Sequence, residues 1–366
     1  MTTSSADSGV PRQAAAASLM QAGLAHLVRW TSRVMFSRVE VRGMDRVPWD
    51  QPCIVSPNHP NALLDALLVG AFTPTRLRYL SRADVFASPL APVLRALGMA
   101  PVYRRRDGFK TVARNKQIFA EERRRLRTGG SLLIFSETEH AHTYPLRPLS
   151  KGSARIALKT QAATDRDVLL VPVGLTYYHL TRPGFKVSLV VGPPLPVRNY
   201  VNQYRDDPPR ALRALRDDLA DAMKACLLLP NRTDDHRDRV NRLHRGTEAL
   251  PFPDMKRALQ TPGVLDAKGA PRPGLMRLAR WISGLNAGPL WLTAVLMRWV
   301  DDPVFALSLK FVVGMIGVPL WWGLLFAIGT AVAGWTTGAG LASLAVLTLG
   351  LRVVLIRHAD PPHPID

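Results

Sequence analysis

Cysteine is scarce in this sequence, and its scarcity excludes a disulfide-stabilised fold. Cys53 and Cys226 are the 2 cysteines among 366 residues, whereas a small secreted scaffold needs several bridges. Neither cysteine belongs to a paired metal-ligand pattern. We therefore expect no cysteine-based zinc site and a reduced, intracellular setting.

Acidic residues are also few, which makes the chain strongly basic. There are 28 Asp and Glu against 48 Lys and Arg, so the net charge is +20 and the pI is near 10.9. Apolar residues nevertheless make up 47% of the chain, which excludes a disordered polycation. A chain that is both basic and apolar is typical of a protein at an anionic membrane surface, more than of a nucleic-acid-binding protein.

Charged residues are absent from a long segment near the C-terminus. Residues 311–351 contain no Asp, Glu, Lys or Arg, a run of 41 residues. A spanning helix needs about 20 apolar residues. The run therefore predicts a C-terminal transmembrane helical hairpin within residues 311–356, with Pro319 interrupting the first helix and residues 334–340 as the break. The alternative is a long helical hairpin buried in a soluble protein.

Cations flank the outer ends of this hairpin and are absent from its turn. Lys310 precedes the charge-free run, and Arg352 and Arg357 follow it. By the positive-inside rule, both outer ends and the basic remainder of the chain face the cytoplasm. We therefore expect a multi-pass protein of the inner (cytoplasmic) membrane.

A charged segment followed by an apolar core and a cleavage site is missing from the N-terminus, so we expect no signal peptide. Residues 1–16 are small and polar and are expected to be flexible. Residues 17–37 mix apolar positions such as Leu24 with the cations Arg29 and Arg33. This pattern predicts an amphipathic helix, which lies either in the membrane interface or on the surface as an ordinary packed helix.

Between these ends, short apolar runs alternate with helical stretches. The predicted strands are 39–41, 53–56, 78–81, 100–102, 132–135, 169–176 and 187–191, and the predicted helices include 61–72, 111–126 and 153–161. The alternation predicts an α/β fold with a mixed sheet wrapped by helices.

The composition also divides the chain into segments. We expect the α/β domain to occupy residues 38–200, followed by a charged helical extension (201–260), a linker with juxtamembrane helices (261–310) and a short tail (357–366). Residues 251–273 have the composition of a linker.

His59 follows one of the predicted strands in a Pro/Asn turn. The next helix is expected to begin near Asn61, which puts Asp65 about one helical turn in and within reach of the imidazole. A carboxylate that orients an imidazole is the arrangement of a general base. A histidine that caps the helix is the alternative interpretation.

Four ordered blocks resemble a known enzyme family. They are Asn58-His59 with Asp65, Gly98-Met99-Ala100-Pro101-Val102-Tyr103-Arg104, Ile134-Phe135-Ser136-Glu137, and Val171-Pro172-Val173-Gly174. Together they make residues 39–196 similar to the phospholipid and glycerol acyltransferases, which include glycerol-3-phosphate and lysophosphatidate acyltransferases. Two features depart from the usual pattern: five residues instead of four separate His59 from Asp65, and the Gly that normally follows Glu137 is missing.

The resemblance implies the glycerolipid acyltransferase fold and a role for the matched residues. His59 is expected to be the general base and Asp65 the residue that orients it, with Asn58 in the same motif as a substrate-binding residue. Arg104 is expected to meet the phosphate of the substrate, and Pro172 to wall the acyl site.

Two further residues have two interpretations each. Glu137 ends a buried strand, where ligands gather in α/β sheets. As a functional residue, Glu137 would hold a hydroxyl of the acceptor or orient a phosphate-binding arginine. The alternative is that it caps the next helix. Lys151 and Arg155, four apart at the start of a predicted helix, either assist phosphate binding or are surface charges.

A metal or cofactor is not expected. Glu137, His140 and His142 form a possible ligand pattern, but no fourth ligand is nearby in the sequence and acyl transfer requires no metal. The acyl thioester, either acyl-CoA or acyl carrier protein, is expected as co-substrate.

The predicted function is a membrane-bound O-acyltransferase of phosphatidate and phospholipid biosynthesis. Its acceptor is glycerol-3-phosphate or 1-acylglycerol-3-phosphate. The first is favoured because the longer His–Asp spacing and the segment Asp301-Asp302-Pro303-Val304-Phe305 resemble that type. Expected partners are the acyl donor, the phosphorylated acceptor and anionic membrane lipid, and not nucleic acid. The alternatives are a basic membrane-anchored nucleic-acid-binding protein and a catalytically inactive lipid-binding scaffold of the same fold.

Overall fold

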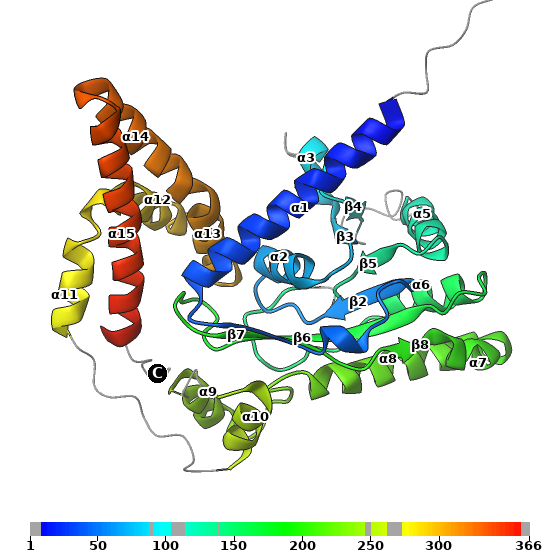
Figure 1. The fold of residues 1–366 in the computed structure, drawn as a ribbon. Helices are drawn as coiled ribbons and strands as arrows, with labels where there is room; N and C mark the ends of the chain where they lie inside the picture. Colours follow the sequence, from blue (N-terminus) through cyan, green and yellow to red (C-terminus); the bar gives the residue numbers. More distant parts are fainter. Residues whose placement is uncertain are drawn as a thin grey trace, which may run out of the picture.

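The strands of the first two hundred residues pair into one mixed sheet (Figure 1). The structure is a computed structural model, and it describes residues 9–87, 91–103, 114–137, 139–245, 250–261 and 273–359. The strands are β1 (Val39–Arg42), β2 (Cys53–Pro57), β3 (Leu77–Arg82), β4 (Met99–Val102), β5 (Ser131–Leu133), β6 (Leu169–Tyr177), β7 (Val187–Val191) and β8 (Leu195–Pro196). Every predicted strand is present, with ends that differ by at most about two residues, and β8 was not predicted.

The strand order brings five carboxyl ends to one edge of the sheet. The order is β1-β7-β6-β2-β5-β3-β4, with β8 beside β6. β6, β2, β5, β3 and β4 run parallel to one another, whereas β7 runs antiparallel to β6 and β1 follows β7. Because ligands of α/β sheets bind beyond the carboxyl ends of the strands, the loops that follow β2, β5 and β3 are the expected place for a site.

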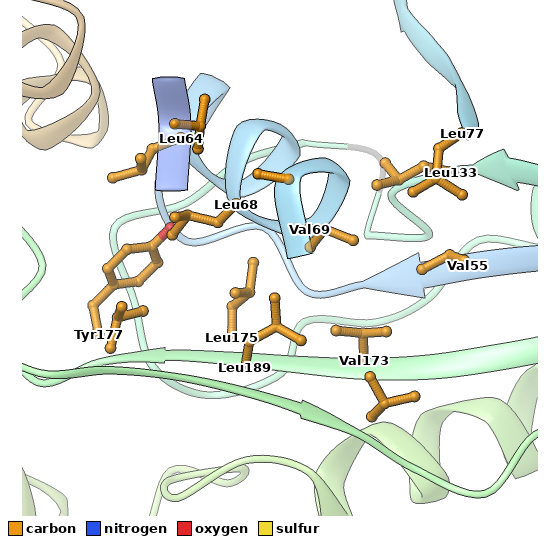
Figure 2. Packing of buried hydrophobic residues seen from close by; sticks show 14 of the residues in the cluster. Val55, Leu64, Leu68, Val69, Leu77, Leu133, Val173, Leu175, Tyr177 and Leu189 are labelled. Atoms are coloured by element: carbon orange, nitrogen blue, oxygen red, sulfur yellow. The ribbon is translucent and has the colours of Figure 1, made fainter. Parts of the chain in front are cut away.

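Helices cover both faces of the sheet. α1 (Gly9–Met35) and α2 (Leu63–Phe72) lie on one face, and α5 (Asn115–Arg127), α6 (Gly152–Gln161) and α8 (Pro208–Ala225) lie on the other. Alternate residues of β6 serve the two faces: Val173 and Leu175 pack toward α2 (Figure 2), and Leu170 packs toward α6 and α8. Burial on both faces explains why β6 reads as a continuous apolar run.

The charged extension predicted at residues 201–260 is part of the domain core. Leu215, Leu219 and Met223 of α8 are fully buried against the second face of the sheet. The extension also contains α7 (Val201–Asp206), α9 (His236–Arg245) and α10 (Phe252–Gln260). The predicted linker at residues 251–273 is therefore wrong in its first part, because Phe252 and Met255 of α10 are buried. Residues 262–272 lie outside the described part of the chain.

The C-terminal segment folds into two long antiparallel helices. The first consists of α13 (Val304–Val312), a π-helical segment (Val313–Gly317) and α14 (Val318–Ala333), and the second is α15 (Trp335–Ala359). α11 (Pro273–Trp281) and α12 (Ala287–Met297) lie beside them (Figure 1). The remaining short helices are η1 (Met44–Arg46), η2 (Ala83–Ala87), α3 (Ala91–Ala96), η4 (Val197–Tyr200) and η5 (Gly284–Asn286).

The bounds of this hairpin differ from the prediction. Residues 334–340 were expected to form the break, but residues 335–340 are the first turns of α15, and Gly334 alone joins the helices with a φ of 87°. Only glycine adopts this conformation at little cost, which explains why one residue suffices. Pro319 lies in the first turn of α14, directly after the π-helical segment, so the helix continues despite the missing N–H.

Two helical stretches are long and apolar enough to cross a membrane. They are Val304–Ala333 and Trp335–Leu355, with mean hydropathies of 2.1 and 1.9. Only 22% and 11% of their most apolar windows are buried within the protein. Most of these apolar side chains therefore have no cover from other described residues of the chain.

Candidate active site

His59 and Asp65 lie side by side at the carboxyl edge of the sheet. β2 ends at Pro57, and His59 follows in the loop that leads into α2. His59 Nδ1 lies 2.9 Å from Asp65 Oδ2, so the predicted contact is present. The Asp65 side chain is fully buried and the His59 side chain is 15% exposed. The carboxylate therefore orients a ring that keeps one accessible edge.

Three donors surround the carboxylate of Asp65. Besides the imidazole, the Asn61 N–H donates to Oδ2 at 2.7 Å and the Tyr177 hydroxyl donates to Oδ1 at 2.7 Å. Burial, together with the neighbouring Asp65, raises the pKa of Tyr177 well above its usual value. The phenol consequently stays protonated and acts as a donor. These bonds hold the carboxylate in one orientation toward His59.

The ring of His59 is held on its other side by an aromatic stack. It lies flat against Phe135, with ring centroids 3.6 Å apart and an angle of 13° between the planes. Within the described residues, no side chain forms a hydrogen bond with His59 Nε2. With Nδ1 directed at Asp65, Nε2 is the ring nitrogen that these contacts leave free.

Glu137 connects two loops of the site through backbone hydrogen bonds. Its Oε2 accepts from the His59 N–H at 2.9 Å, and its Oε1 accepts from the Arg147 N–H at 3.0 Å. Burial raises the pKa of this carboxyl, although the two amides act in the opposite direction. The alternative of a helix cap is wrong, because the next helix in the described chain, α6, begins only at Gly152.

Asn58 braces the loop that contains His59 against β6. Its side-chain N–H donates to the Leu175 carbonyl at 3.0 Å, and its Oδ1 accepts from the Leu175 N–H at 2.7 Å. The side chain is buried. These contacts give Asn58 a positioning role, while contact with substrate stays a prediction.

The loop between His59 and Asp65 is strained. Ala62 has φ 46° and ψ −121°. Among the described residues, it is the only one other than glycine that has a positive φ. The amide group of Asn61 is buried without a hydrogen-bond partner. A non-glycine residue in this conformation is strained, and the strain lies in the loop that joins His59 to Asp65.

The first long C-terminal helix packs directly on this loop. The Ser308 hydroxyl donates to the Asn61 carbonyl at 2.6 Å and accepts from the Leu64 N–H at 3.1 Å. His140 Nε2 lies 3.5 Å from Asp302 Oδ2, and its ring meets Phe305 at 4.9 Å. The segment at residues 302–308 therefore closes one side of the site.

The possible metal pattern is not assembled. Both oxygens of Glu137 accept backbone hydrogen bonds, and His140 pairs with Asp302. In the part of the chain that the structure describes, no group of three His, Cys, Asp or Glu side chains is arranged to hold a metal ion.

Of the predicted phosphate-binding and acyl-binding residues, the structure describes Lys151 and Pro172 but not Arg104. Arg104 lies outside the described residues; β4, two residues before it, ends at the same edge as β2. Lys151 is half-buried immediately before α6. Pro172 lies on the opposite face of the sheet from Asp65, because its ring is directed toward Gly192 and Cys226 below α8. Its assignment to the acyl site stays a prediction, and the geometry does not bring it to His59.

Several residues of the site were missed from the sequence. A chain of hydroxyls joins Ser56, Ser136 and Ser153, with oxygen separations of 2.6 and 2.8 Å, and it ties the ends of β2 and β5 to the start of α6. Arg82 ends β3 at the same edge and is close enough to contribute to lowering the pKa of His140, which burial lowers most. Its position directly after a predicted strand was the available signal.

An apolar cavity of about 470 Å³ runs along α2, from Leu63 to beyond its end at Phe72. It lies between α1, α2, α3 and the π-helical segment, and residues such as Leu24, Leu63, Leu67 and Met99 line it. Its walls are suited to an alkyl chain, since they present few polar groups.

Comparisons with known proteins place these features in context. Residues 38–176 match the family profile described as Acyltransferase. A search of curated proteins finds no match. Among solved structures, the chain is similar to the crystal structure of the 1-acyl-sn-glycerophosphate (LPA) acyltransferase, PlsC, from Thermotoga maritima. The sequence identity is 22%, the match covers 53% of this chain and 79% of that chain, and the TM-score is 0.37.

Proposed function

From the premise that residues 38–176 belong to the acyltransferase family, we propose that this enzyme acylates a phosphorylated glycerol at a membrane surface. The donor is a fatty acyl thioester, and the acceptor is glycerol-3-phosphate or 1-acylglycerol-3-phosphate. The observation that carries the proposal is the buried Asp65 carboxylate 2.9 Å from the partly exposed His59 imidazole.

The proposed reaction uses His59 as general base. Nδ1–H donates to Asp65, so Nε2 has the lone pair that accepts the proton of the acceptor hydroxyl. The hydroxyl oxygen attacks the thioester carbonyl and forms the new ester bond. The carbon–sulfur bond breaks, and the imidazolium returns the proton to the departing thiolate. No covalent enzyme intermediate is needed.

Asp65 and its partners support this role. A carboxylate that orients an imidazole selects the tautomer and stabilises the imidazolium that forms during attack. The donors from Asn61 and Tyr177 keep the carboxylate in place during that change. Preorganisation of this kind reduces the reorganisation required in the transition state.

We assign the two substrates to different parts of the domain. The apolar cavity beside Leu63 takes the acyl chain of the thioester, whose carrier is CoA or acyl carrier protein. Arg104, with Lys151 and Arg82 at the same edge, takes the phosphate of the acceptor, because guanidinium groups bind phosphate oxygens in pairs. Glycerol-3-phosphate is the favoured acceptor, because the five residues between His59 and Asp65 and the segment at residues 301–305 resemble the glycerol-3-phosphate type.

We further propose that the two long apolar helices cross the inner membrane and that the catalytic domain faces the cytoplasm. Lys310 and Arg352 lie at the outer ends of the charge-free run and both lie beside α1 of the catalytic domain, and the turn at Gly334 has no cation nearby in sequence. The positive-inside rule then selects the cytoplasm for the basic end. Much of the +20 charge would face anionic headgroups.

A direct assay tests the proposal. Membranes containing the full-length protein are incubated with a radiolabelled acyl-CoA or acyl carrier protein and with each acceptor in turn. We expect lysophosphatidate or phosphatidate to form, and His59→Ala to lower the rate by at least ~10³-fold. His236→Ala, on α9, is the matched control and should retain the wild-type rate. Transfer by His59→Ala at the wild-type rate would remove His59 as base, and binding of lipid without transfer by the wild type would favour an inactive scaffold.

A further inference from the structure

A second cavity lies where the catalytic domain meets the apolar helices. Its volume is about 510 Å³, and α1, α12, the first long C-terminal helix and α15 surround it. Trp30, Val34 and Leu290 contribute apolar walls, and Lys310 and Arg352 contribute two cations. His59 and Asp65 do not line it, and it shares no lining residue with the cavity beside Leu63.

The two cations have hydrogen-bonding capacity that the protein leaves unused. Lys310 Nζ donates to the Thr181 carbonyl at 2.9 Å, and one Arg352 nitrogen donates to Ser283 Oγ at 2.7 Å. Neither forms an ion pair with an acidic side chain anywhere in the described ranges. A lysine has three donors and an arginine five, so most of them remain available to a ligand.

The position of the cations matches the headgroup level of a bilayer. Lys310 precedes the charge-free run on the first long helix, and Arg352 follows it on the second. The two helices are antiparallel (Figure 1). Lys310 and Arg352 therefore come to the same end of the hairpin, where both line the cavity together with residues of α1. The apolar wall of the cavity continues along the two stretches that are long enough to span a membrane.

We propose that this cavity binds one anionic phospholipid of the surrounding bilayer. Lys310 and Arg352 bind the phosphate, and an acyl chain lies along Trp30, Val34 and Leu290. The inference rests on the proposed membrane insertion but not on the proposed reaction. Such a lipid would fasten α1 of the catalytic domain to α12 and α15.

Charge complementarity selects an anionic lipid over a zwitterionic one. Two cations without an acidic partner favour a ligand with net negative charge, and each hydrogen bond to its phosphate is charge-assisted. A phosphatidylcholine headgroup has a compensating ammonium group, which two neighbouring cations repel.

Native mass spectrometry of the full-length protein in neutral detergent tests the proposal. The protein is titrated with phosphatidylglycerol and, separately, with phosphatidylcholine of the same chains. We expect one phosphatidylglycerol to bind at least about tenfold more tightly than phosphatidylcholine. Arg352→Gln and Lys310→Met should each lose about tenfold in phosphatidylglycerol affinity, whereas Arg280→Gln, an exposed arginine on α11, should lose none.

Two further variants keep the test decisive if a charge change impairs folding. Ala294→Phe fills the cavity without altering charge and should weaken binding, and Arg352→Lys should restore part of the affinity lost in Arg352→Gln. Equal binding of the two lipids, or equal loss in Arg280→Gln, would overturn the proposal. Retention of phosphatidate or lysophosphatidate without phosphatidylglycerol would also overturn it, because the occupant would then be a reaction component. Lipid binding is measured without acyl transfer, so failure here leaves the proposed reaction untouched.

Discussion

Tyr177 donates its phenol hydrogen to Asp65 Oδ1 at 2.7 Å, from the end of β6 to the first turn of α2. The other oxygen of the same carboxylate lies 2.9 Å from His59 Nδ1. The proposed base, His59, is thus oriented by Asp65, and Asp65 is itself held by Tyr177 at the end of β6. This arrangement makes the orientation of His59 depend on the packing of α2 against β6.

We expect Asp65→Asn to lower kcat by ~10² to 10⁴-fold with little change in KM, because the amide allows the wrong imidazole tautomer. Tyr177→Phe should lower kcat by about tenfold, since one hydrogen bond to the carboxylate is lost. Steady-state kinetics with a saturating acyl thioester measure both effects. Tyr200→Phe, which removes an exposed tyrosine–aspartate bond elsewhere, is the matched control and should leave kcat unchanged. A rise in KM alone would contradict the orienting role.

The contact of Ser308 with the catalytic loop predicts that the first long C-terminal helix affects activity. Ser308→Ala removes the bonds to the Asn61 carbonyl and the Leu64 N–H, and should cost about 1 kcal/mol of stability and reduce kcat. Thr160→Val removes a buried hydroxyl that bonds only within α6, at 2.7 Å to the Ile156 carbonyl. If both variants lose stability equally and neither changes kcat, the helix does not position the loop.

The strained backbone at Ala62 predicts an unusual stabilising substitution. Glycine adopts φ 46° without the steric cost that an alanine bears, although it adds unfolded-state entropy. We expect Ala62→Gly to raise the free energy of unfolding by about 1 kcal/mol and Ala62→Val to lower it. Thermal unfolding in neutral detergent, followed by circular dichroism, measures the difference. A melting temperature of Ala62→Gly below that of the wild type would show that the loop has no strain to relieve.

A buried ion pair connects β1, β7 and the start of α10. Lys186 Nζ lies 2.6 Å from Glu40 Oε2, and the Phe252 N–H donates to Glu40 Oε1 at 3.0 Å. Burial alone would raise the pKa of Glu40, but the hydrogen bonds from Lys186 and Phe252 lower it overall.

We therefore expect Lys186→Met to destabilise the domain by about 3–5 kcal/mol, because it leaves Glu40 buried and unpaired. The double variant Glu40→Gln/Lys186→Met should be more stable than Lys186→Met, since the neutral amide still accepts from Phe252. Chemical unfolding monitored by circular dichroism compares the three proteins. Additive losses in the double variant would contradict a coupled pair.

Two stacked histidines predict loss of stability in acid. The rings of His179 and His244 are stacked, with their centroids 4.6 Å apart. Burial lowers the pKa of His179 to about 3, and His244, Arg182 and other cations contribute to the decrease. Burial and Arg182 lower the pKa of His244 to about 4. Both pKa values fall below the ordinary value near 6.5, so the unfolded chain binds protons that the folded one does not.

The contribution of these histidines is therefore present above pH 6.5 and is lost as the pH falls from about 6.5 toward 4. Between pH 7 and pH 5 we expect a loss of at least about 2 kcal/mol. Melting temperatures of the wild type and of His179→Gln/His244→Gln at both pH values test this. The double variant should lose less on acidification, and an unchanged difference would assign the acid sensitivity to other groups.

Local sequence pattern determined the elements of this protein and one contact of its site. Apolar runs of three to eight residues marked the strands, and the charge-free run of 41 residues marked the helical hairpin. The contact between His59 and Asp65 was also predictable, because one helical turn limits how far a side chain can lie from the preceding loop.

The rest of the site depended on the tertiary structure. Tyr177, Glu137 and Ser308 meet the His59 loop only because parallel strands end at one edge and the first long C-terminal helix packs across it. Contacts between residues this far apart in sequence follow from strand register and helix packing, which local periodicity does not encode. The single-residue turn at Gly334 and the burial of α10 have the same origin, since a backbone conformation and a docked helix face are decided by the neighbours they meet.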